Sequence, residues 1–170
     1  MPTNPWRLIL RPQVVMAFDD VSIPLPPMRS PDIRHLVMDL AERYCIEEGI
    51  TDITFICSIA LHRFIRPDEF RHICGPRLFD KYFKQGRMKN YNAVDEEFGK
   101  HLGFTEAGED VLVCREFVEA DLAIYANCNY VSMDGGYKSY ATGEVAGMQP
   151  LADQQQPAVY TVQPPHSGVS

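Results

Sequence analysis

Apolar residues along this 170-residue chain gather in three short runs, and polar side chains follow each run. The runs cover residues 14–18, 50–57 and 121–127. Short continuous apolar runs are typical of strands that are buried on both faces. The pattern therefore predicts three buried strands, with polar groups collected where each strand ends.

The segment between the first two runs has a helical pattern. Its apolar residues recur at spacings of three and four, which makes one face apolar: Ile33, Leu36, Val37, Leu40, Ala41 and Tyr44. Pro31 is expected to open this helix with Ser30 as its N-cap, and Gly49 to end it as a left-handed cap. Strand, helix and strand in this order predict a βαβ unit, whose two strands are parallel.

The rest of the chain adds smaller elements and a tail. We expect two short helices at 67–74 and 77–83, an irregular segment at 86–99, a hairpin from 102–105 and 111–114, and a helical turn at 115–120. Residues 1–146 then form one α/β domain, a small and mostly parallel sheet with flanking helices. Residues 147–170, rich in proline and glutamine, are expected to be a flexible, disordered tail.

Composition and charge narrow the class of protein. The chain is 45% hydrophobic and 23% charged, as in globular domains. Its 16 basic and 23 acidic residues give a net charge of -7, which argues against nucleic-acid and anionic-membrane binding. No apolar run approaches the roughly 18 residues of a membrane span, and the first residues are too short for a secretory signal, so a cytoplasmic protein is expected.

The cysteines predict neither a disulfide framework nor a structural zinc site. There are five, an odd number, with no Cys-x-x-Cys pair: Cys45, Cys57, Cys74, Cys114 and Cys128. We expect buried free thiols.

Polar residues at the ends of the three predicted strands are the main candidates for chemistry. They are Asp19 and Asp20, His62 and Arg63, and Asn127 and Asn129. Ligands of open parallel sheets bind beyond the carboxyl ends of the strands, so these groups are expected to meet at one edge. Lys138, in the glycine loop of residues 134–139, would join them there.

Each candidate has an alternative interpretation. Asp20 can instead cap the proline-rich turn that follows it, and His62 can be a structural loop histidine. The glycine loop departs from the Walker pattern, because Tyr137 and Ser132 stand where that pattern needs glycine, so ATP hydrolysis is not expected. Lys138 is either a covalent anchor for a carbonyl-bearing cofactor or a solvated loop lysine.

Several of these segments together resemble the N-terminal domain of the nickel-dependent lactate racemase family. The resemblance runs from about Val14 to Gly143. The matching segments are residues 17–28, 60–63, 67–71, 102–105, 119–122 and 133–139. It implies a Rossmann-like domain of a two-domain α/β enzyme, with the active site between the domains.

The resemblance also implies a cofactor and site residues. The family carries a nickel-pincer nucleotide, attached to a lysine and holding nickel through its own atoms and a histidine. A hydride moves from C2 of a 2-hydroxy acid to this cofactor and returns to either face. By position, Lys138 matches the anchoring lysine, Gly135 and Gly136 belong to the cofactor-binding loop, His62 matches a catalytic acid–base histidine, and Asp20 matches an acidic residue of the pocket.

The sequence departs from the family at three places. Ile23 stands where lactate racemases have an arginine, three residues after the aspartate, so a carboxylate clamp is missing. Residues 127–131 hold no second catalytic histidine, and residues 152–157 hold no imidazole to ligate nickel. The family's C-terminal domain has no counterpart in these 170 residues.

We therefore expect a lactate-racemase-like domain that racemises or epimerises a 2-hydroxy acid other than lactate. This chain is expected to be incomplete alone, because the nickel-ligating histidine and the second domain are missing, and a separate chain would supply them. The alternative is a non-catalytic, truncated or diverged module that binds a nucleotide-like ligand or a partner subunit. A weaker third possibility is an ordinary phosphate-ligand domain.

Overall fold

The computed structural model describes residues 11–21, 30–59, 62–92, 95–106, 108 and 110–126. The elements are β1 (Gln13–Asp19), α1 (Ile33–Glu47), β2 (Asp52–Ser58), α2 (Pro67–Tyr82), β3 (Met88–Asn90), β4 (Gly99–Phe104), β5 (Asp110–Cys114), α3 (Arg115–Glu119) and β6 (Leu122–Ala126). Two short 3₁₀ turns, Phe83–Gln85 and Glu96–Phe98, lie beside β3 and β4.

Four of the strands form one parallel sheet in the order β3-β2-β1-β6. The three predicted strands are confirmed as β1, β2 and β6, and β1–α1–β2 is the predicted βαβ unit. The expectation of an irregular segment at 86–99 is wrong for β3. This strand has only three residues, two of them polar, so it carries no apolar run; its pairing with β2 defines it.

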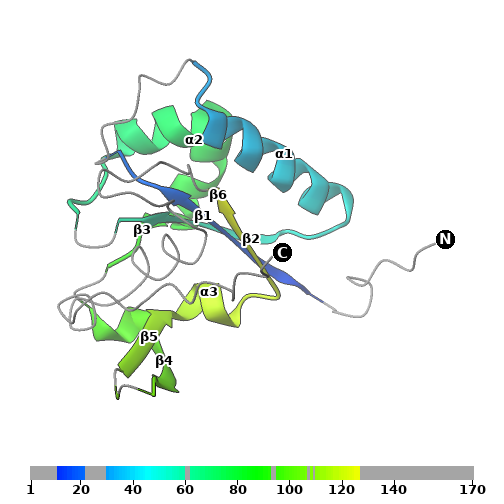
Figure 1. Cartoon of the computed structure of the whole chain (residues 1–170). Helices are drawn as coiled ribbons and strands as arrows, with labels where there is room; N and C mark the ends of the chain where they lie inside the picture. Colours follow the sequence, from blue (N-terminus) through cyan, green and yellow to red (C-terminus); the bar gives the residue numbers. More distant parts are fainter. Residues whose placement is uncertain are drawn as a thin grey trace, which may run out of the picture.

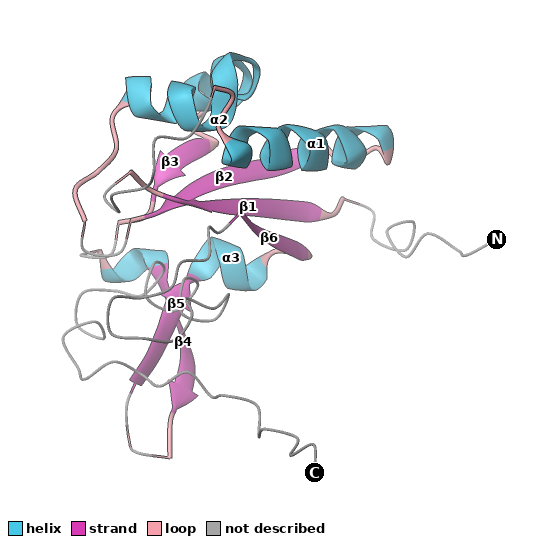
Figure 2. Cartoon of the chain, turned by 45° about the horizontal axis from the view of Figure 1, so that its top comes forward, coloured by secondary structure: helices cyan, strands magenta, loops and turns pink. Residues whose placement is uncertain are grey.

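The sheet is covered on both faces (Figures 1 and 2). Helices α1 and α2 cover one face, while α3 and the antiparallel β4–β5 hairpin lie on the other. Alternate residues of β1 point to the two sides: Val14, Met16 and Phe18 pack under the helices, and Val15 and Ala17 pack toward α3. This alternation between two apolar layers explains why residues 14–18 of β1 are all apolar.

The apolar face of α1 does not face the core. Helix α1 buries Arg34, Met38, Glu42 and Cys45, and it exposes the apolar set that the spacing of the sequence singles out: Ile33, Leu36, Val37, Leu40 and Tyr44. Of the predicted stripe, only Ala41 packs against the core. An amphipathic helix ordinarily buries its apolar face, so α1 is turned from the orientation its pattern suggests.

The ends of the helices follow local signals, with two corrections at the start of α1, which begins at Ile33 and not at Pro31. Asp32, rather than Ser30, is the N-cap of α1, because its Oδ1 accepts the backbone N–H of Arg34 at 2.8 Å. Gly49 has a φ of 82° just past the helix, as expected for a left-handed cap. The predicted break at Gly75-Pro76 is present as a kink inside α2, where Gly75 has φ 80° and ψ 157°.

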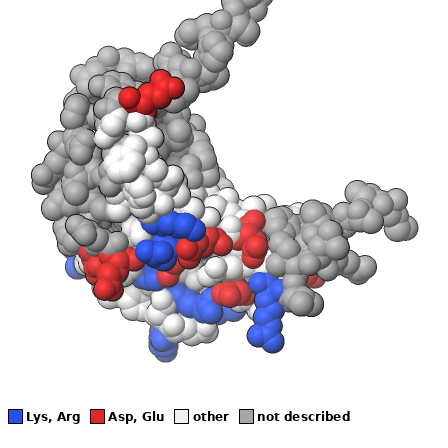
Figure 3. Space-filling model, turned by 90° about the horizontal axis from the view of Figure 1, so that it is seen from below, with Lys and Arg blue, Asp and Glu red and all other residues white. Residues whose placement is uncertain are grey.

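Surface and thiol features agree with a globular domain. The four cysteines within the described ranges, Cys45, Cys57, Cys74 and Cys114, are buried free thiols as predicted; Cys128 lies outside those ranges. On the face shown in Figure 3, acidic and basic side chains are interspersed. Among the described helices, none is both long and apolar enough to cross a membrane.

Candidate functional site

The carboxyl ends of β1 and β2 bring Asp20 and His62 together. The two strands end side by side, with Asp19 paired to Ser58. Asp20 directly follows β1, and His62 lies four residues beyond β2. Asp20 Oδ2 is 2.8 Å from His62 Nδ1, across 42 positions of sequence. The parallel register therefore produces the meeting of acid and imidazole that the strand-end pattern predicts.

The two partners of this pair differ in exposure. The side chain of Asp20 is 2% exposed, whereas that of His62 is 46% exposed. A carboxylate only accepts hydrogen bonds, so Nδ1 of the imidazole is the donor and the proton of a neutral ring lies on Nδ1. The free lone pair is then on Nε2. A half-exposed ring with this tautomer is suited to take a proton from a ligand and to return it.

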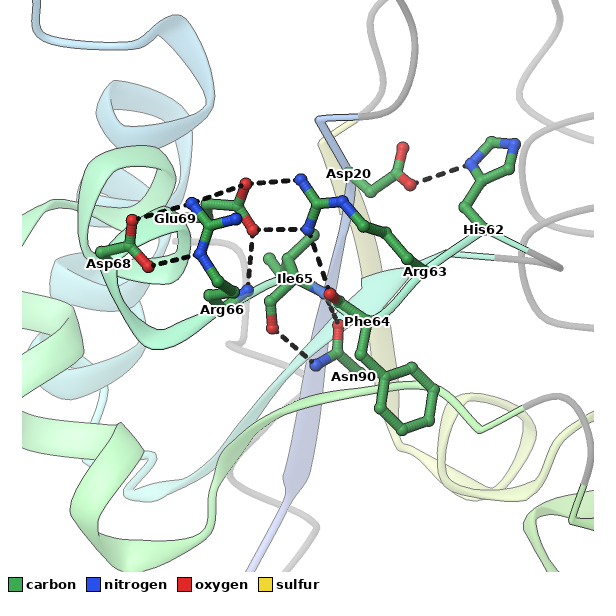
Figure 4. A network of polar contacts seen from close by, with 9 residues as sticks. All are labelled: Asp20, His62, Arg63, Phe64, Ile65, Arg66, Asp68, Glu69 and Asn90. Atoms are coloured by element: carbon green, nitrogen blue, oxygen red, sulfur yellow. Dashed lines mark hydrogen bonds and ion pairs between the residues drawn. The ribbon is translucent and has the colours of Figure 1, made fainter.

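Short contacts hold the loop that carries His62 (Figure 4). The backbone N–H of His62 donates to the carbonyl of Ile59 at 2.8 Å. Further along, the amide of Asn90 binds both backbone groups of Ile65, at 3.0 and 3.1 Å. Asn90 is the last residue of β3, so this strand, which the sequence pattern did not reveal, ties the loop to the sheet.

Arg63 is held by α2. Its guanidinium makes two hydrogen bonds to the carboxylate of Glu69, at 2.6 and 2.8 Å (Figure 4). Glu69 also accepts the backbone N–H of Arg66 at 2.7 Å, which caps the start of α2. The Arg63 guanidinium, followed by this backbone hydrogen bond, lowers the pKa of Glu69 to about 2. Arg63 thus anchors the loop to α2 beside the Asp20–His62 pair.

The side chain of Asp19 is bound by a residue of the neighbouring strand β6. Its Oδ1 accepts the hydroxyl of Tyr125 at 2.6 Å, and both groups lie at the end of the β1–β6 ladder. Burial, together with the neighbouring Asp19 carboxylate, raises the pKa of the Tyr125 phenol. Tyr125 therefore stays protonated and donates to Asp19 near neutral pH.

The thiols closest to this edge are not suited to nucleophilic chemistry. Cys57 is fully buried in β2, and burial raises the pKa of its thiol well above its ordinary value, with a further contribution from Asp20. Burial likewise raises the pKa of Cys74. A thiol rather than a thiolate is therefore present at each position. The described residues contain no cluster of three or more His, Cys, Asp or Glu side chains that would hold a metal ion.

Some of the site residues predicted from the sequence lie within the described residues, and others do not. Asp19, Asp20, His62 and Arg63 lie at the predicted edge, though Arg63 turns toward Glu69. The remaining candidates lie outside the described residues: Asn127, Asn129, Gly135, Gly136 and Lys138.

Three residues of this region were not singled out by the sequence. They are Asn90 in β3, Tyr125 in β6 and Arg34 in α1. Nothing in the sequence around Tyr125 indicates that its hydroxyl binds a carboxylate on another strand. The same holds for Arg34, whose partners Asp19 and Asp20 lie 15 and 14 positions away.

Together these features define an α/β domain with a parallel sheet and a carboxylate–imidazole pair at the carboxyl ends of its strands. The model of the lactate racemase N-terminal domain family matches residues 7–156. This match covers most of the chain, and the chain belongs to that family.

A solved structure has the same fold. The lactate racemase apoprotein from Thermoanaerobacterium thermosaccharolyticum superimposes with a TM-score of 0.68 at 13% sequence identity. The match covers 91% of this chain and 35% of that one, so the chain spans about a third of the length of that protein. No curated protein sequence matches the chain significantly.

Proposed function

We propose that this chain is the acid–base module of a 2-hydroxy-acid racemase or epimerase. The observation that carries the proposal is the 2.8 Å contact between buried Asp20 and half-exposed His62 at the edge of the parallel sheet. Family membership supports the reaction class. In an enzyme of this class the substrate hydroxyl must lose and regain its proton, and an imidazole is the side chain best matched to that task near neutral pH.

Each side chain of the pair has a separate role in this proposal. His62 Nε2 accepts the proton of the substrate hydroxyl when the C2–H bond breaks, and donates it back when that bond reforms. Asp20 keeps the Nδ1–H tautomer in place and stabilises the imidazolium that forms when His62 takes the proton. Because Asp20 is buried and its partner is not, the carboxylate orients the ring while the ring meets the ligand.

The family resemblance implies a nickel-pincer nucleotide anchored at Lys138. When bound, this group supplies the hydride acceptor that oxidises and re-reduces C2. The described edge fits such a group in one respect: it provides an imidazole and a carboxylate at the strand ends, where nucleotide-like ligands of parallel sheets bind. Lys138, with Gly135 and Gly136, would hold the cofactor.

A second candidate is a module that binds a nucleotide-like ligand without turnover. The chain covers 35% of the solved lactate racemase, and Ile23 takes the place of the family's arginine. Without that arginine the family's carboxylate clamp is missing, which favours either a substrate other than lactate or no substrate at all. In the first case we propose that a separate chain supplies the second domain.

The test is interconversion of enantiomers. The chain is produced together with the cofactor-synthesis enzymes and with the C-terminal domain of a lactate racemase, and is incubated with single enantiomers of several 2-hydroxy acids. Chiral chromatography then follows the appearance of the opposite enantiomer. We expect turnover of an acid other than lactate. His62→Gln should lower it by roughly a hundredfold or more, as expected on removing a general acid–base group.

His101→Gln is the matched control. His101 is an exposed imidazole of the β4–β5 hairpin, and it lies against Phe104. This variant should retain the activity of the parent chain. Equal activity in the parent and in His62→Gln would refute the acid–base role. Cofactor binding without turnover of any acid would favour the binding module.

A further inference from the structure

A buried arginine lies directly behind the Asp20–His62 pair. The side chains of Arg34 and Asp32 are 4% and 1% exposed and form an ion pair at 2.7 Å. Asp32 receives three hydrogen bonds from Arg34: from the backbone N–H, from Nε at 3.0 Å and from Nη2 at 2.7 Å. The guanidinium is therefore fixed in one orientation at the start of α1.

The remaining arm of this guanidinium points at the end of β1. Arg34 Nη1 donates to the carbonyl of Asp19 at 2.6 Å and to the carbonyl of Asp20 at 2.9 Å. Asp20 lies one residue beyond the last pair of the β1–β2 ladder. Two successive carbonyls bound to one nitrogen fix the direction in which the chain leaves the sheet. That direction sets where the Asp20 side chain points.

Stability alone does not explain an ion pair at this place. Burial by itself raises the pKa of the Asp32 carboxyl, but the hydrogen bonds and charge of Arg34 outweigh it and the pKa lies below its ordinary value. The pair is thus charged and desolvated. Buried ion pairs of this kind often contribute less to stability than apolar residues of similar volume, because desolvation offsets their attraction.

We propose that Arg34 is a positioning residue: held by Asp32, it binds the carbonyls of Asp19 and Asp20 and so aims the Asp20 carboxylate at Nδ1 of His62. The inference rests on the proposed role of His62. It predicts that the planar, forked shape of the guanidinium matters as well as its charge, since a lysine ammonium cannot bind Asp32 and two carbonyls in the same fixed geometry.

The experiment measures which ring nitrogen of His62 carries the proton, and it does not depend on enzymatic activity. The full chain is labelled with ¹⁵N-histidine, and ring nitrogen shifts are recorded at mildly alkaline pH, where an ordinary imidazole is neutral. His62→Gln assigns the signal. The parent chain should show the proton on Nδ1. In Arg34→Lys we expect the ratio of Nδ1–H to Nε2–H forms to fall roughly tenfold, as for the loss of one charge-assisted hydrogen bond.

Arg77→Lys is the matched control. Arg77 also binds two carboxylates, those of Asp39 and Glu42, but it joins α2 to α1 and no hydrogen bond or ion pair of the structure links it to Asp19 or Asp20 within the described residues. This variant should lose stability and keep the Nδ1–H form of His62. An unchanged tautomer ratio in Arg34→Lys, or an equal change in both variants, overturns the proposal.

A second variant covers the case in which Arg34→Lys does not fold. Asp32→Glu keeps the charge and moves the carboxylate by one methylene, and it should shift the tautomer ratio in the same direction. Failure of both variants to fold would assign the pair to stability alone and overturn the positioning role. A parent chain without the Nδ1–H form would instead refute the Asp20–His62 pairing itself, before any substitution, and so separates the two claims.

Discussion

The buried carboxylate of Glu42 on α1 accepts a hydrogen bond at 2.7 Å from the partly exposed Arg77 on α2. The same carboxylate accepts from Lys81 Nζ at 2.7 Å and from the Tyr82 hydroxyl at 2.8 Å. Burial alone raises the pKa of Glu42, but these three donors hold it below its ordinary value. A buried charge on α1 is therefore paired, which allows the helix to turn its polar side inward.

Replacing Glu42 should weaken the contact between the helices. Glu42→Gln removes the charge that Arg77 and Lys81 share, and we expect the free energy of unfolding at neutral pH to fall by about 2 kcal/mol. Chemical denaturation measures the change. Glu47→Gln, at an exposed position of the same helix, should stay within about 0.5 kcal/mol of the parent chain. Equal effects at the two positions would contradict the assigned orientation of α1.

The exposed apolar stripe gives a second test of that orientation. Met38 is 1% exposed and Leu40 is 55% exposed. Met38→Ala should cost roughly 3 kcal/mol of unfolding free energy, as expected for a cavity in the core. Leu40→Gln should change it by no more than about 0.5 kcal/mol. The opposite ranking in thermal or denaturant unfolding would show that the stripe faces the core.

The kink of α2 depends on a glycine for two reasons. Gly75 has a φ of 80°, and a Cβ there would lie 2.3 Å from Nε2 of His35 on α1. Gly75→Ala should therefore destabilise the fold by roughly 3 kcal/mol, through backbone strain and a steric clash. Gly86→Ala is a milder comparison, since Gly86 lies in the left-handed region (φ 69°, ψ 11°) with nothing within 4 Å of its Cβ position. Gly86→Ala should lower the free energy of unfolding by about 1 kcal/mol.

Glu69 makes the anchor of the His62 loop sensitive to acid. Its pKa is lowered to about 2 in the fold, so its contribution is fully present above the unfolded pKa near 4.5 and is lost as pH falls toward 2. Glu69→Gln should cost about 1 kcal/mol at pH 7. In denaturation curves at decreasing pH, the difference between variant and parent should vanish between about pH 4.5 and 2. A constant difference across this range would contradict the account.

The strands and their connection could be predicted because the signal is local. Residues 14–18 are apolar at every position, and both faces of β1 are covered, so pattern and burial agree. The convergence of Asp20 and His62 followed from the same pattern, since parallel strands bring their carboxyl ends to one edge. These expectations needed only chain order and hydrophobicity.

The orientation of α1 and the support of the site could not be predicted in this way. The helix buries Arg34 and Glu42 because each finds partners elsewhere: Arg34 on the carbonyls of Asp19 and Asp20, and Glu42 on α2. Spacing within one helix contains no information on such partners. Strand β3 was missed for a related reason, because its pairing with β2, rather than its composition, makes it a strand.

We propose that this chain binds the cofactor of its family through Lys138 and contributes Asp20 and His62 as an acid–base pair. The most direct measurement is intact mass under mild conditions, after production with the cofactor-synthesis enzymes, for the parent chain, Lys138→Ala and the control Lys84→Ala. We predict an adduct of nucleotide size in the parent and in Lys84→Ala, and none in Lys138→Ala. An unmodified mass in all three, or an adduct that persists in Lys138→Ala, would contradict the claim.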